Sequence, residues 1–257
     1  MVGIRTESDI KLMKEAGRIN YECHKLLESK VRIGISTKEL DEIAEKFITD
    51  NGGIPSFKGY DGFPGSICTS INDEVVHGIP SDEVVLYNGD IISIDIGVIY
   101  KGFHSDSART HAVGDIKKET MNLLEHTKQS LYEGLSVIKE GEKLSSISAS
   151  IEKYAKKNNL GIVRELVGHG VGKSLHEAPD IPNYYDKNDY EDLTLKAGMT
   201  LAIEPMLTIG SPEIGILSDG WTIVTQSGKN AAHYEHTVLV TKDGYEILTG
   251  EWMIKNG

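Results

Sequence analysis

Residues 90–113 read DIISIDIGVIYKGFHSDSARTHAV, and their pattern predicts a β-hairpin. The first strand is rich in β-branched side chains and alternates, with isoleucines on one face and Asp95 on the other. A turn centred between Tyr100 and Lys101 would place Asp95 opposite Asp106 on the returning strand. Carboxylates that face each other across a sheet repel, and cations bound between them would offset this repulsion. The pair is therefore either half of a metal site or two solvated strand carboxylates.

The composition is typical of a soluble globular protein, with 257 residues of which 39% are hydrophobic and 26% charged. No stretch approaches the roughly 18 apolar residues of a membrane span, and the N-terminus lacks the apolar region of a secretory signal. We therefore expect a cytoplasmic protein that neither spans nor binds a membrane. Cys23 and Cys68 are too few for a disulfide framework. The net charge of -12 argues against a nucleic-acid groove and suits an amine-bearing substrate, although most such charge is solubilising.

Helical periodicity and capping signals predict four long helices. They cover residues 6–30, 36–51, 117–139 and 141–158, the second beginning with a capping box at Ser36 and Glu39. Strand patterns cover residues 67–71, 75–79, 163–167, 199–209, 221–225 and 233–241, in addition to the hairpin. The protein is therefore expected to contain helix pairs packed over strands.

A weak repeat relates the two halves of the chain at a constant offset of 107. Gly34 matches Gly141, and Asn51 matches Asn158 at the ends of the two shorter helices. Any two amphipathic helices share such spacing, so chance remains an alternative to duplication. A duplication would give two halves of similar structure, with a site between them that draws ligands from both.

The second half carries polar residues where strands should be apolar. His169 lies among glycines, while Glu204 and Glu235 lie within predicted strands. Taken singly, each is more often an ordinary loop or edge residue. Together with Asp95 and Asp106 they make four carboxylates and one imidazole, a hard ligand set that suits two divalent ions roughly 3.5 to 4 Å apart.

At these residues the sequence resembles a known family, the type I methionine aminopeptidases of the creatinase or pita-bread fold. The matching motifs are the aspartates eleven apart, HGIP at 77–80, GHGVG at 168–172, HEAP at 176–179, IEP at 203–205 and EHT at 235–237. The resemblance covers essentially the whole chain. It implies an α+β fold of two pseudo-symmetric halves, about 1–115 and 116–250, with helices packed on a curved, mainly antiparallel sheet. We expect a single catalytic domain, 1–257, without an N-terminal extension.

The resemblance also implies a role for each ligand. Asp95 would chelate one metal, Asp106 and Glu235 would bridge both, and His169 and Glu204 would complete the other site. A hydroxide bridging two ions is a nucleophile at neutral pH and would attack the first peptide bond. Glu204 would act as general base and then as acid.

Two further histidines receive catalytic roles from the resemblance. His176 would donate to the developing oxyanion, and His77 would contact the nitrogen after the scissile bond. The family's methionine pocket maps onto Phe57, Tyr60, Phe63, Cys68, His77, Leu175 and Trp221. Aromatic rings suit a thioether, but several of these residues could equally be ordinary core. Leu175 replaces an aromatic of some relatives. His233 stands where relatives often carry glutamine, and it either orients Glu235 or lies on the surface.

The predicted function is removal of the initiator methionine from nascent peptides and proteins whose second residue is small. Two divalent ions (cobalt, manganese, iron or zinc) would serve as cofactors, with cellular availability deciding among them. The expected partners are N-terminal peptide substrates, at the ribosome or free, and the expected state is a monomer without direct nucleic-acid binding. Alternatives are an Xaa-Pro aminopeptidase of the same fold and a non-catalytic peptide-binding module. Only 27 residues separate His176 from Glu204, too few for the insertion of a type II enzyme.

Overall fold

Two helices and a hairpin sheet form the first part of the fold, seen in a computed structural model that describes residues 2–186 and 192–251. Its elements are α1 (Glu7–Glu28), α2 (Thr37–Asp50), β1 (Ile54–Pro55), the 3-10 turn η1 (Tyr60–Gly62), β2 (Cys68–Ile71), β3 (Glu74–Val76), β4 (Ile91–Tyr100) and β5 (Phe103–Ala112). Helix α1 packs on β4 and β5, and α2 packs on α1 and β1.

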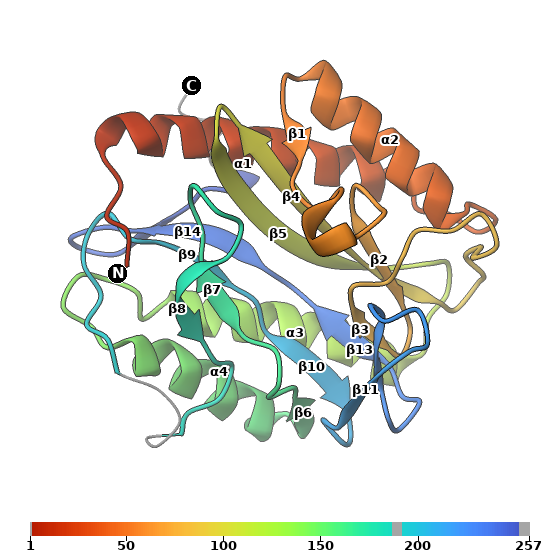
Figure 1. The fold of residues 1–257 in the computed structure, drawn as a ribbon. Helices are drawn as coiled ribbons and strands as arrows, with labels where there is room; N and C mark the ends of the chain where they lie inside the picture. Colours follow the sequence, from red (N-terminus) through yellow and green to blue (C-terminus); the bar gives the residue numbers. More distant parts are fainter. Residues whose placement is uncertain (1, 187–191, 252–257) are drawn as a thin grey trace.

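The second part again begins with two helices. Its elements are α3 (Lys118–Leu135), α4 (Leu144–Lys157), β6 (Leu160–Ile162), β7 (Gly168–Gly170), β8 (Glu177–Ile181), β9 (Thr200–Ile203), β10 (Met206–Ile209), β11 (Ile214–Ile216), β12 (Ile223–Thr225), β13 (Ala231–His233), β14 (His236–Val240) and β15 (Tyr245–Ile247). In Figure 1, α1 and α2 lie along one side of the molecule and α3 and α4 along the other, with the strands between them. No helix in the two described ranges is long and apolar enough to cross a membrane.

The strands pair antiparallel in four small sheets. Strand β4 is the centre of the first, where it pairs with β1, β2 and β5. The largest sheet has the order β15-β14-β9-β7-β8, and two three-stranded sheets are ordered β13-β10-β6 and β11-β12-β3. The predicted α+β class with helices on mainly antiparallel strands is confirmed.

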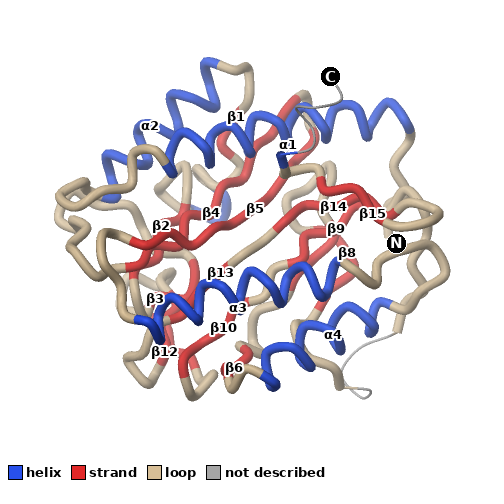
Figure 2. The backbone as a smooth tube through the Cα atoms, turned by 180° about the vertical axis from the view of Figure 1, so that it is seen from behind, coloured by secondary structure: helices blue, strands red, loops and turns tan. Residues whose placement is uncertain are grey.

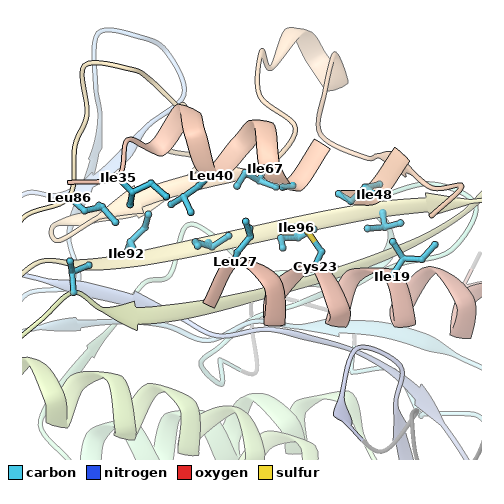
Figure 3. Packing of buried hydrophobic residues seen from close by; sticks show 14 residues of the cluster. Ile19, Cys23, Leu27, Ile35, Leu40, Ile48, Ile67, Leu86, Ile92 and Ile96 are labelled. Carbon is cyan, nitrogen blue, oxygen red and sulfur yellow. The ribbon is translucent and has the colours of Figure 1, made fainter. Parts of the chain in front are cut away.

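The helix predictions are confirmed because capping and periodicity act locally. The Thr6 side chain accepts a hydrogen bond from the Asp9 backbone N–H at the start of α1, and Ser36 does the same for Glu39 at the start of α2. The apolar faces then meet β4, as Figure 3 shows. Fully buried side chains in this cluster include Ile19, Cys23, Leu27, Leu40, Ile48, Ile92 and Ile96.

The two shorter helices have the same surroundings. Helices α2 and α4 both contain 14 residues and begin at positions 107 apart. The residue before each forms an isolated antiparallel bridge, Ser36 with Val85 and Lys143 with Thr194. This likeness supports the repeat, while the boundary between halves near residue 115 stays a prediction.

The predicted hairpin register is wrong by two residues. Lys101 and Gly102 both have positive φ, 47° and 84°, as in a two-residue turn whose twist matches the flanking strands. The turn is therefore centred after Lys101, and Asp95 pairs with Ala108 while Asp106 pairs with Gly97. A shift of two residues leaves both carboxylates on the same face, because side chains alternate with a period of two.

Three other strand predictions need correction. Residues 163–167 form no strand, and the segment before them pairs instead, as β6. The predicted strands at 199–209 and 233–241 are each interrupted, giving β9 and β10 in one case and β13 and β14 in the other. The interruptions fall at Glu204 and Glu235, two of the predicted metal ligands.

Candidate active site

The hairpin places two aspartates side by side in the interior. Asp106 is 4% exposed and faces Gly97, which has no side chain to separate it from Asp95 two residues earlier. A Cβ at Gly97 would lie 2.6 Å from the Ser56 Cβ, so the position requires glycine. The Asp106 carbonyl accepts a hydrogen bond from the Thr237 hydroxyl at 2.8 Å, and the Asp106 N–H donates one to the same hydroxyl at 2.9 Å. The two carboxylates are therefore held on rigid strands.

The second half brings three further predicted ligands to the same place. The Nε2 atom of His169 on β7 lies 3.5 Å from Glu204 Oε1 and 3.9 Å from Asp106 Oδ2. One ligand atom each from Asp106, His169 and Glu235 lies within 4.8 Å of the others, a grouping that can hold a metal ion. All five residues predicted as ligands line one cavity of about 280 Å³.

Burial sets the protonation of the carboxylates. It raises the pKa of Asp95 to about 7 and that of Glu204 to about 8. Burial also raises the pKa values of Asp106 and Glu235 well above their usual range, and repulsion from the neighbouring carboxylates adds to the effect. Without a cation, this cluster holds protons at neutral pH.

The unsatisfied oxygen atoms fit divalent metal ions. Asp95 Oδ1, Asp106 Oδ1 and Glu235 Oε1 are buried and have no hydrogen-bond partner among the described residues. The Nδ1 atom of His169 lies 2.9 Å from the Gly170 carbonyl, which can only accept, so Nδ1 carries the hydrogen and Nε2 presents its lone pair. Burial lowers the pKa of His169 to about 3, which keeps the ring neutral as a metal ligand requires.

The other predicted residues line the same cavity. They are Phe57, Tyr60, Phe63, Cys68, His77, Leu175, His176 and Trp221, joined by Asp61, which was not predicted. Phe57, Phe63, Cys68 and Leu175 form one buried cluster, against which Trp221 packs. The rings of Phe63 and Trp221 meet edge to face, with centroids 5.2 Å apart.

Two histidines are oriented by specific contacts. Tyr60 Oη lies 2.9 Å from His176 Nδ1, and the ring of His176 stands 4.3 Å from that of His169. His77 has a positive φ of 61°, a conformation that non-glycine residues rarely adopt. Burial lowers the pKa values of both histidines, that of His77 to about 4, so both are neutral.

For His233 the sequence allowed two alternatives, a residue that orients Glu235 or a surface residue. The residue is 1% exposed, so the surface alternative is wrong. Its Nε2 atom lies 3.4 Å from Glu204 Oε2, which makes Glu204 rather than Glu235 the carboxylate that it contacts.

Comparison with known proteins agrees with this geometry. A sequence profile of metallopeptidase family M24 matches residues 11–242. Methionine aminopeptidase 1 of Bacillus subtilis is 52% identical over 97% of this chain and 99% of its own length. The chain belongs to the methionine aminopeptidases of metallopeptidase family M24. The methionine aminopeptidase of Escherichia coli is 41% identical over 96% of this chain and 94% of its own.

Solved structures lead to the same family. The methionine aminopeptidase of Rickettsia prowazekii superimposes with a TM-score of 0.94 at 40% identity, covering 97% of this chain and all of its own. That of Thermotoga maritima gives 0.95 at 38% identity, over 98% of this chain and all of its own. A prolidase from Pyrococcus furiosus, 22% identical, shares the fold with a TM-score of 0.76. The pita-bread fold is thus confirmed, and this methionine aminopeptidase family member is a metal-dependent hydrolase that uses a divalent metal and acts on peptides.

Proposed function

We propose that the chain removes the initiator methionine from peptides and proteins whose second residue is small. The observation that supports this most is a single cavity that unites a buried carboxylate cluster with an aromatic pocket. The first element suits hydrolysis assisted by metal ions, and the second suits a methionine side chain. The short spacing between His176 and Glu204 places the chain with the type I enzymes.

Two divalent ions would be held by Asp95, Asp106, His169, Glu204 and Glu235. When bound, such ions lower the pKa of water and polarise a carbonyl group, which supplies a nucleophile at neutral pH. The ligand set of oxygen atoms and one imidazole accepts cobalt, manganese, iron or zinc, so availability selects the metal in the cell.

Glu204 is proposed as the group that moves the proton. Its burial keeps its pKa near neutrality, which suits a group that accepts a proton from water and passes it to the leaving amine. The Nε2 atom of His233 lies 3.4 Å from the second oxygen of this carboxylate, where it would help to orient Glu204.

His176 is proposed to stabilise the oxyanion. Tyr60 Oη lies 2.9 Å from Nδ1, and with this hydroxyl as the donor, Nε2 would carry the hydrogen of the neutral ring. A neutral N–H donor that is already oriented stabilises the negative charge that develops on the carbonyl oxygen. His77, also neutral, would contact the peptide nitrogen from the opposite wall, beside Trp221.

The methionine side chain would lie among Phe63, Cys68 and Trp221. Burial raises the pKa of the Cys68 thiol well above its usual range, so the thiol is neutral and weakly polar. This wall excludes charge and accommodates a flexible thioether. We further propose that the protein acts on nascent chains as a cytoplasmic monomer without direct nucleic-acid contacts, in keeping with its net charge of -12.

Peptide hydrolysis tests the proposal directly. Metal-stripped protein should release methionine from Met-Ala-Ser only after manganese or cobalt is added, and should leave Met-Lys-Ser intact. The variant Asp106→Ala should be inactive, while the matched variant Asp115→Ala, at an exposed carboxylate, should retain full activity. No release with any metal by folded protein would favour the binding module, and cleavage of Xaa-Pro peptides alone would favour the other peptidase.

A further inference from the structure

A second cavity, of about 550 Å³, is lined by α1, β5 and α3, and it shares Glu235 with the candidate active site. Figure 2 shows its setting, with α1 and α3 on either side of β5, β13 and β14. On β5, Asp106 lines the candidate active site, while Arg109 and His111 line the second cavity together with Ala108 and Thr110. Helix α1 adds Tyr21 and Lys25 to its walls, and α3 adds Lys128 and Tyr132.

Arg109 is a largely buried cation without a counterion. No carboxylate lies within ion-pair distance of it in the described ranges, and its nearest polar contact is the Thr249 carbonyl, 3.4 Å away. Its guanidinium stacks on the Tyr21 ring at 5.0 Å, and burial lowers its pKa. A buried charge in this position is stabilised best by an anion that it can reach.

Other groups around the cavity also lack partners. Lys128 makes no ion pair within residues 2–186 and 192–251, and the buried His111 Nε2 has no hydrogen-bond partner there. Three acids of the described chain border the cavity: Glu28 is engaged by Lys25, Glu251 is exposed, and Glu235 is one of the proposed metal ligands. An arginine, a lysine and a histidine therefore line one cavity in a protein whose net charge is -12.

We propose that this cavity binds a small phosphate-bearing anion. A phosphate group offers several acceptor oxygens and two negative charges, which match a guanidinium, an ammonium and an imidazole that converge from β5 and α3. The rings of Tyr21 and Tyr132 leave apolar wall for an organic group attached to the phosphate. This site shares Glu235 with the peptidase cavity but presents Arg109, His111 and Lys128, which do not line that cavity, and its occupancy does not depend on the proposed peptidase activity.

Titration calorimetry on the full-length, manganese-loaded protein tests the site with two probes, inorganic phosphate and phenyl phosphate. Both should bind saturably, and more weakly as salt is added. Arg109→Gln should weaken binding about tenfold or more, and Lys128→Gln about threefold. Lys46→Gln, at an exposed lysine of α2 far along the sequence from the cavity, is the matched control and should bind as the wild type does. Tighter binding of phenyl phosphate would identify a phosphate ester as the ligand, and equal binding would identify free phosphate.

Phosphate can also bind to active-site metal, so His176→Ala serves as the opposing variant. Binding that survives His176→Ala and weakens in Lys128→Gln supports the proposal. Binding that is lost in His176→Ala and unchanged in Lys128→Gln places the anion at the metal and overturns it, as does the absence of saturable binding in the wild type. Lys128 is exposed on α3, so its variant keeps the test decisive if Arg109→Gln fails to fold.

Discussion

Removing one catalytic-site carboxylate should make the metal-free protein more stable at alkaline pH. Without metal, burial keeps Asp95 protonated in the native state up to a pKa of about 7, against 3.8 when unfolded. Between these values the native state binds more protons than the unfolded state, so the free energy of unfolding falls as pH rises. Asp95→Asn removes the group whose deprotonation is unfavourable and should flatten this decline.

The magnitude follows from the same two values. Each pH unit between them corresponds to about 1.4 kcal/mol, so the gap from 3.8 to about 7 corresponds to about 4 kcal/mol at pH 8. An asparagine leaves some buried polar surface unpaired, so a net gain on the order of 2 kcal/mol is expected for Asp95→Asn. In a domain of this size that raises Tm by roughly 4 to 8 °C. A metal ion binds the deprotonated carboxylates, so it favours the ionised native state. At one hundred times its Kd it should stabilise the wild type by about 2.7 kcal/mol.

Thermal unfolding of chelator-treated protein at pH 5, 6, 7 and 8, with and without manganese, measures both effects. The wild type should lose stability across this range without metal and regain it with manganese at pH 8. Asp95→Asn should be the more stable protein without metal and the less stable with it, while Asp82→Asn, at an exposed carboxylate, should follow the wild type. Metal-free stability that is constant or rises from pH 5 to 8 would refute the buried-carboxylate argument.

Three substitutions test other parts of the structure. Tyr60→Phe removes the hydroxyl that orients His176, so kcat should fall about three- to tenfold with little change in Tm, in a steady-state assay. Gly17→Ala, which in a typical helix would stabilise, should instead cost about 2 kcal/mol in urea unfolding, because its Cβ would lie 1.9 Å from the Leu248 carbonyl oxygen. Ile96→Ala, at a fully buried side chain of the β4 core, should lower the free energy of unfolding by about 2 to 5 kcal/mol in the same assay.

The helices could be predicted from the sequence because their signals are local. Thr6 and Ser36 cap the helices they precede, and apolar residues recur at the helical period behind them. The candidate metal ligands could also be predicted from the sequence, because a carboxylate buried in an apolar strand is unfavourable unless it has a partner such as a cation. Every residue predicted for the site lines one cavity.

The hairpin register could not be predicted, because it depends on which residues accept positive φ. Lys101 and Gly102 both adopt positive φ and form a two-residue turn. A lysine rarely adopts positive φ, so its place in the turn is not visible in the sequence. Asp61 was missed for a related reason: its place in the cavity follows from the 3-10 turn at Tyr60–Gly62, where it too has positive φ, 47°. The second cavity needs Arg109 and Lys128 from separate elements, so no single stretch of sequence indicates it.

Glu204 and Glu235 face each other directly, whereas Asp95 and Asp106 do not. Pairing of Ile203 with His236 and of Met206 with His233 shares one register, which places Glu204 level with Glu235. At this level the ladder is interrupted, and other partners take the freed backbone groups. The Glu204 carbonyl accepts from Asn183 Nδ2 at 3.1 Å, and the Glu235 N–H donates to the Ala108 carbonyl at 2.9 Å. Because every freed group named here is satisfied elsewhere, the interruption costs little, and both carboxylates line the same cavity.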